Sequence, residues 1–308
     1  MEQFNNHPLF MRHNIDSAMS SLWDFYKKKF LSLFIISFAM SLVIQYISTL
    51  VNLQELSQIT DPMAMLEKMK ELIVPIIAIS IVNLLFNVIL QHYILYNPLD
   101  NENNFFMSVL KSMKYFIPYL IIMIILAFAA SIAIVLGILL LVVGVIFSII
   151  YIMTLYLFIL PIMMVEGSNI GNTISRTITL AHRNFWSNIG WVAVFIIILV
   201  VISLLLSGII LLPFSGNFIK TIMNPGEASG LVNLTTNPIF IILSALAGAL
   251  TMPLIPLFSC ILYFNGKSQE DTNREIIPNE PDNNRVRVED LYAKPYSDDH
   301  PDNPDNRI

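Results

Sequence analysis

Six long apolar runs constrain this chain more than any other feature of its sequence. None contains Asp, Glu, Lys or Arg, and each holds about the 20 residues that a helix needs to cross the hydrocarbon core of a bilayer. The runs are 30–51, 72–96, 115–136, 138–160, 188–212 and 239–264. Because backbone polar groups cannot stay unsatisfied in lipid, the runs predict an all-α polytopic membrane protein with six transmembrane helices.

Composition supports a membrane protein and divides the chain into three parts. Hydrophobic residues make up 56% of the sequence and charged residues 13%, and the mean hydropathy is +0.69. Soluble domains have about 25% charged residues. We predict a cytoplasmic N-terminal segment with an amphipathic helix (1–29), a six-helix transmembrane domain (30–264) and a disordered acidic cytoplasmic tail (265–308).

The third and fourth runs follow each other with little between them. Together they are too long for one crossing, and Gly137 lies where they join. A tight hairpin near Gly137 is therefore predicted.

The distribution of basic residues predicts the orientation. Six crossings place both termini on one side, which holds eight basic residues before the tail is counted, against three on the other. The eight are Arg12, Lys27, Lys28, Lys29, Lys111, Lys114, Arg176 and Arg183, and the three are Lys68, Lys70 and Lys220. Cytoplasmic loops carry the excess of Lys and Arg, so both termini are predicted to be cytoplasmic.

Basic residues followed by aromatic residues precede the first, third and fifth runs. These segments are 19–30 (MSSLWDFYKKKF), 107–116 (MSVLKSMKYF) and 174–186 (ISRTITLAHRNFW). Lys and Arg reach toward headgroups, and aromatic rings favour the membrane interface. The pattern predicts three cytoplasmic interfacial amphipathic helices, each before a two-helix hairpin, in a three-hairpin pseudo-repeat. The alternative is that every cytoplasmic end of a span collects such residues.

The third of these segments has a clear helical periodicity. Apolar residues recur at helical steps, and polar residues form a second stripe. The apolar stripe is Ile170, Ile174, Ile178, Ala181 and Phe185, and the polar stripe is Asn172, Arg176, Thr179 and Arg183. We expect an amphipathic helix that lies along the interface or packs under the bundle.

Residues 161–195 carry a motif made of Pro161, Glu166-Gly167, Arg176-Thr177, Leu180 and Phe185-Trp186. This motif resembles the signature of the membrane domain family of bacterial glycerophosphoryl diester phosphodiesterases and of related six-span bacterial membrane proteins. In that family a serine commonly follows the arginine, where this chain has threonine. The resemblance implies a multi-pass protein of the bacterial inner (plasma) membrane. Outside 161–195 it rests on the number and spacing of the spans.

A phosphodiesterase barrel needs roughly 250 residues, whereas only 265–308 follow the last apolar run. We therefore expect the catalytic domain to be absent from this chain. The tail is rich in Pro, Asp and Asn and poor in apolar residues, which is typical of disorder.

One polar face interrupts the second run. Asn83, Asn87 and Gln91 recur at steps of four and so share one side of a helix. Because polar groups are costly against lipid, this face is predicted to look inward. Interhelical hydrogen bonding is the preferred interpretation, and a substrate path is the alternative.

Ionisable residues gather near the membrane at Glu166, Arg176, His182 and Arg183. The two arginines lie seven residues apart, on one helical face, and could bind a phosphate headgroup or a partner. Lipid-recognition clusters usually hold about four to eight basic residues, however. The cluster is therefore a candidate contact site, with anchoring as the alternative.

Enzyme signatures are missing from the sequence. The five histidines have no metal-binding spacing, and there is no nucleophile elbow or phosphate loop. We expect no catalytic residue, no cofactor and no metal. The expected partners are membrane lipid and, at the cytoplasmic face or tail, a protein, but no nucleic acid. The predicted function is a non-enzymatic, lipid- or partner-associating membrane module. The alternative is a transporter of small molecules or lipids that uses the polar face of the second run.

Overall fold

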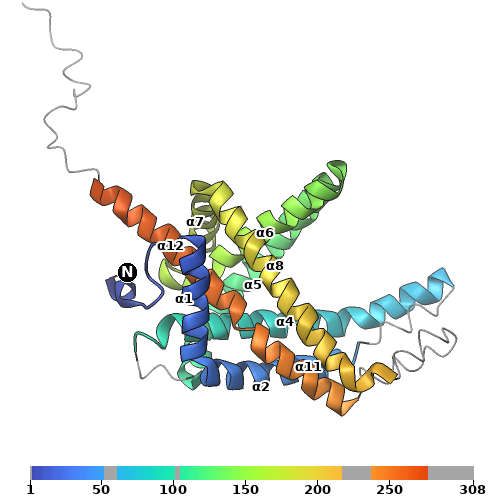
Figure 1. The fold of residues 1–308 in the computed structure, drawn as a ribbon. Helices are drawn as coiled ribbons and strands as arrows, with labels where there is room; N and C mark the ends of the chain where they lie inside the picture. Colours follow the sequence, from blue (N-terminus) through green and yellow to red (C-terminus); the bar gives the residue numbers. More distant parts are fainter. Residues whose placement is uncertain (1, 52–60, 101–104, 217–236, 277–308) are drawn as a thin grey trace, which may run out of the picture. The chain divides into compact units, whose positions relative to one another are not determined.

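The computed structural model describes residues 2–51, 61–100, 105–216 and 237–276, and all regular secondary structure in these ranges is helical (Figure 1). The elements are η1 (Glu2–Asn6), α1 (Ile15–Lys28), α2 (Phe30–Ser48), α4 (Pro62–Tyr96), α5 (Phe105–Leu139), α6 (Leu141–Val165), α7 (Ile170–Arg183), α8 (Phe185–Leu211), η2 (Leu212–Phe214), α11 (Pro238–Thr251) and α12 (Leu254–Ile276).

Six helical segments are long and apolar enough to cross a membrane, which confirms the prediction of an all-α multi-pass protein. They are α2, α4, α5, α6, α8 with η2, and α11 with α12 up to Asp271. Several segments are longer than their apolar runs. The second span begins at Pro62 rather than at residue 72, because Asp61 caps the helix through the amides of Met63 and Ala64.

The boundary predicted for the tail is wrong at its start. Helix α12 continues past residue 264 to Ile276, so residues 265–276 are helical. Asn265 explains part of this extension, because its side chain accepts a hydrogen bond from the His13 amide at 2.9 Å and packs in the interior. The rest of the predicted tail, 277–308, lies outside the described residues.

The three predicted anchor segments do not fold alike. The first and third are separate helices, α1 and α7, which end at breaks around Lys29 and Asn184. The second is part of α5, which runs without a break from Phe105. The described structure therefore contains two separate anchor helices, and the pseudo-repeat is incomplete at its middle unit.

The buried face of α7 also differs from the predicted apolar stripe. Thr173, Thr177, Leu180 and Ala181 are buried, whereas Ile178 is 47% exposed. Short threonine side chains allow α7 to pack closely against its neighbours, and isoleucine can face lipid at little cost. The sequence pattern identified the helix but not the side that packs.

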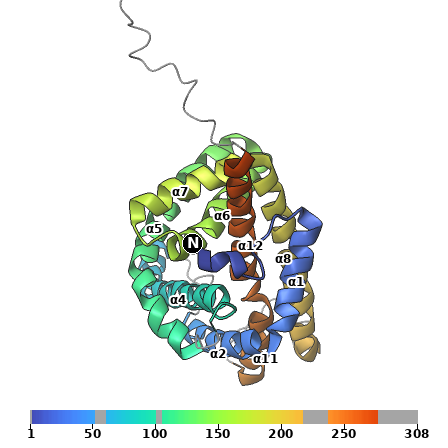
Figure 2. The same ribbon diagram turned by 90° about the vertical axis from the view of Figure 1, so that its left-hand side faces the viewer.

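Burial is concentrated at one end of the spans. The inner core comprises residues 88–95 of α4, 157–164 of α6 and 254–264 of α12, which are all buried except Ile255. The N-terminal segment lies against this core (Figure 2). The Phe4 ring contacts the rings of Tyr96 and Phe264. We call the other end of the spans, where large apolar side chains are exposed, the outer half.

Candidate functional site

A tight turn between α6 and α7 positions the candidate site. Glu166 ends α6 by donating its amide to the carbonyl of Ile162 at 2.8 Å. Gly167 follows with φ +120°, a conformation that L side chains rarely adopt. Asn169 then caps α7 by accepting the amide of Asn172 at 3.1 Å. The Glu166-Gly167 part of the motif therefore has a direct structural role in the turn.

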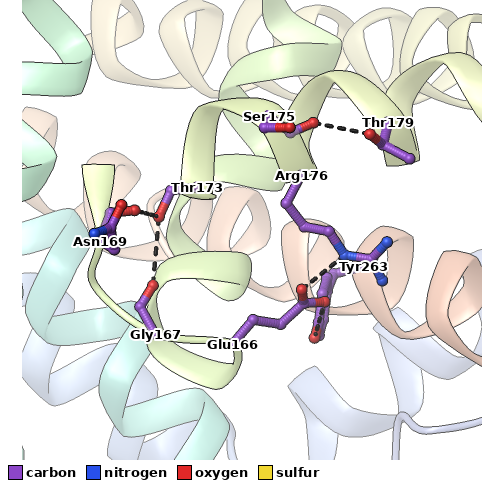
Figure 3. Close-up of polar contacts among 8 residues, drawn as sticks. All are labelled: Glu166, Gly167, Asn169, Thr173, Ser175, Arg176, Thr179 and Tyr263. Atoms are coloured by element: carbon purple, nitrogen blue, oxygen red, sulfur yellow. Dashed lines mark hydrogen bonds and ion pairs between the residues drawn. The ribbon is translucent and has the colours of Figure 1, made fainter. Parts of the chain in front are cut away.

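Glu166 and Arg176 form an ion pair across this turn (Figure 3). The Arg176 Nε donates to Glu166 Oε2 at 2.7 Å, and the Tyr263 hydroxyl donates to Glu166 Oε1 at 3.0 Å. The two charged side chains are only 21% and 16% exposed. The carboxylate is thus fixed by groups from two further helices, α7 and α12.

A polar cavity of about 340 Å³ opens beside this pair. Its lining comprises Ile162, Glu166, Gly167, Asn172, Thr173, Ser175, Arg176 and Thr179. The cavity offers hydroxyl groups and one guanidinium next to one carboxylate. Guanidinium and hydroxyl donors suit a phosphate, and a carboxylate suits an ammonium group.

The other two residues of the predicted cluster lie elsewhere on α7. The His182 Nε2 is 3.3 Å from the Tyr151 hydroxyl, and the His182 ring stacks on Phe185. Neither His182 nor the exposed Arg183 lines the polar cavity. The structure therefore brings Glu166 and Arg176 together and separates them from His182 and Arg183.

The polar face of α4 is used in packing contacts. Gln91 is 1% exposed, and its amide nitrogen lies 2.9 Å from the Sγ of Cys260 on α12. The Asn87 amide donates to the carbonyl of Asn83, one turn earlier, at 3.1 Å. The Gln91 contact fits the interpretation of this face as interhelical hydrogen bonding, whereas the Asn87 bond stays within α4.

Two important polar residues carried no sequence signal. Tyr263 lies within an apolar run, and its partner Glu166 is 97 residues away in the chain. His7 is 3% exposed; its Nδ1 accepts the Leu9 amide, and its Nε2 donates to the carbonyl of Ile94, each at 3.2 Å. Burial lowers the pKa of His7 to about 4, so the ring is neutral at pH 7.

Among the described residues, no three His, Cys, Asp or Glu side chains gather closely enough to hold a metal ion. Comparison with protein-family models, with curated proteins and with solved structures finds no match for this chain. The fold and the site define a multi-pass α-helical membrane protein with a polar cavity at the α6–α7 turn.

Proposed function

We propose that this protein is a non-enzymatic membrane module of the bacterial inner membrane that binds a phosphate-bearing headgroup in the cavity at the α6–α7 turn. The observation that carries the proposal is the Glu166–Arg176 pair, held at 2.7 Å on the wall of a polar cavity. Both termini are cytoplasmic in this proposal, which follows from the excess of Lys and Arg on that side.

The charges of the cavity favour one type of headgroup. Arg176 supplies a guanidinium for a phosphate, and Glu166 supplies a carboxylate for a cationic group. A headgroup that carries both a phosphate and an ammonium therefore matches the cavity better than one that is only anionic. Because a single arginine lines the cavity, a strong preference for highly anionic lipids is not expected.

Lipid-dependent thermal stabilisation of the detergent-purified protein tests this proposal. We expect a short-chain phospholipid with an ethanolamine headgroup to stabilise the wild type and Arg176→Lys. Arg176→Gln should weaken binding roughly ten- to hundredfold, because a hydrogen bond to a charged group contributes about 1.5–3 kcal/mol. Arg183→Gln is the matched control, since Arg183 lies on the same helix outside the cavity.

Two further arms identify the source of the phosphate and the chemistry of the headgroup. Soluble glycerophosphoethanolamine tests whether the headgroup binds without acyl chains, and phosphatidylglycerol tests whether charge alone is enough. Equal stabilisation of wild type and Arg176→Gln by every ligand would refute headgroup binding in this cavity. It would leave a protein partner as the interpretation of this surface.

A further inference from the structure

The turn between α5 and α6 is apolar and exposed throughout. Its five residues, Leu139, Leu140, Leu141, Val142 and Val143, are 72–78% exposed. The chain carries no Asp, Glu, Lys or Arg between Lys114 and Glu166. The connections of the other two hairpins, in contrast, hold ionisable residues such as Glu55 and Lys220. Exposing a turn of this composition to water is unfavourable.

Backbone contacts keep this turn compact. The Leu140 amide donates to the carbonyl of Gly137 at 3.0 Å, and the Ser148 hydroxyl lies 2.9 Å from the carbonyls of Ala133 and Gly144. A Cβ on Gly137 would lie 2.8 Å from the Gly144 carbonyl oxygen, so the two helices touch through their glycines. The negative end of the α5 dipole therefore lies beside the positive end of α6, which reduces the cost of leaving water.

The packing of α7 along α6 indicates how deeply the α5–α6 hairpin can enter the bilayer. Arg176, in the middle of α7, pairs with Glu166 at the end of α6. At the C-terminal end of α7, His182 contacts Tyr151, which lies about four turns before Glu166 in α6. Polar residues lie at both ends of α7, with Asn169 as its N-cap and Arg183 in its last turn, so both ends belong at the polar interface. The part of α6 from Tyr151 to Glu166 therefore follows the interface and does not cross the bilayer.

The remaining length of α6 is short. From Tyr151 to Leu141 the helix rises about 15 Å, which is half of the roughly 30 Å thickness of the hydrocarbon core. The ring centroids of Phe147 in α6 and Trp186 in α8 are 6.3 Å apart. The beginning of α8 therefore lies beside this short part of α6. Length and composition allow α5 and α6 to cross a membrane, but their packing on α7 limits their depth.

We propose that α5 and α6 form a re-entrant hairpin, which enters the bilayer from the side of the α6–α7 turn, ends near its middle and returns to the same side. Lipid acyl chains cover the exposed turn. The alternative, a turn in water, would expose five large apolar side chains, each of which favours an apolar environment by about 1.5–3 kcal/mol. Both termini stay on one side of the membrane, because a hairpin that crosses twice and one that does not cross return the chain to the same face.

Single cysteines in the turn test this depth. Cys260 is fully buried, so the wild type serves as the unlabelled control. Leu140→Cys and Val142→Cys replace side chains that are 72% exposed and contribute nothing to the core. Ser57→Cys, in the polar connection between α2 and α4, is the positive control for the far side of the membrane. We expect a membrane-impermeant maleimide to label Ser57→Cys in intact cells at least tenfold faster than either turn variant.

Depth-dependent quenching gives a positive signal. Each turn variant is labelled in detergent with an environment-sensitive fluorophore and reconstituted into phosphatidylcholine vesicles with nitroxides at the headgroup or deep in the acyl chain. We expect the deep nitroxide to quench at least twice as strongly as the headgroup nitroxide. Stronger quenching from the headgroup, or labelling as fast as at Ser57→Cys, would overturn the re-entrant hairpin. Protection from both nitroxides would overturn its contact with lipid and indicate a second protein copy.

Discussion

The inner and outer halves of the spans differ although the same helices form both. In α4, residues 88–95 are all buried, whereas Met63, Leu66 and Val74 near its start are more than half exposed. The inner core contains aromatic rings and hydrogen-bonded polar side chains, whereas large apolar side chains dominate the exposed outer half. Hydropathy is therefore a poor guide to packing in this protein, because both halves of a span are apolar.

The largest expected effect is the difference in unfolding free energy between an alanine substitution in the inner core and one in the outer half. Phe258 is fully buried and stacks on Phe195 with ring centroids 4.0 Å apart. We expect Phe258→Ala to lower the free energy of unfolding by about 3–5 kcal/mol. Phe128→Ala, at a position that is 73% exposed in the outer half, should change it by less than about 0.5 kcal/mol. Denaturant titration in detergent measures both, and similar losses would contradict the comparison.

The next largest effect is a loss of stability at acidic pH, which we expect from His7 beside the inner core. Burial lowers the pKa of His7 from 6.5 to about 4, so the folded state binds its proton less readily than the unfolded state. The contribution of neutral His7 to the free energy of unfolding is fully present above pH 6.5. It falls by up to about 3 kcal/mol as the pH drops toward 4. Unfolding at pH 7.0 and 4.5 should show this loss in the wild type, and a smaller one in His7→Gln. An equal loss in both would assign the pH dependence to other groups.

Loss of the Glu166 carboxylate should have a moderate effect. Glu166→Gln removes the negative charge beside Arg176 and weakens the bond from Tyr263, and we expect a loss of about 1–3 kcal/mol. Asp24→Asn is the matched control, because the Asp24–Lys27 pair is exposed and contributes about 0–1 kcal/mol. Thermal unfolding of both variants gives the comparison. Equal, small losses would mean that the turn is fixed by its backbone contacts.

The smallest expected effect concerns the polar face of α4. Gln91→Leu removes the contact with Cys260, and interhelical hydrogen bonds in membranes contribute about 0.6 kcal/mol on average. We expect a loss of that size, with a further small loss when Asn83 and Asn87 are also changed to Leu. If the triple variant is as stable as the wild type, the packing interpretation fails and the substrate path becomes the better one.

The sequence was informative wherever one long local pattern sufficed. Run length predicted the six long apolar helical segments, and the turn at Leu140 lies three residues from the Gly137 hairpin predicted for it. The resemblance drew attention to Glu166 and Arg176, which do lie together. Tyr263 and His7 could not be predicted, because their partners are distant in the chain and a buried hydrogen bond leaves no periodicity. The packed side of α7 was missed because lipid, like a core, accepts apolar residues.

The docked N-terminal segment imposes an order on synthesis and folding. Its partners are separated from it by long stretches of chain: the His7 contact with Ile94 spans 87 residues, and the His13 contact with Asn265 spans 252. Residues translated first must therefore wait for α12, and contacts of such long range form slowly. During this wait Phe4 and His7 lack their contacts with Phe264 of α12. We therefore expect closure of this end to be among the last steps of assembly, because Phe264 and Asn265 of α12 complete the contacts of the N-terminal segment.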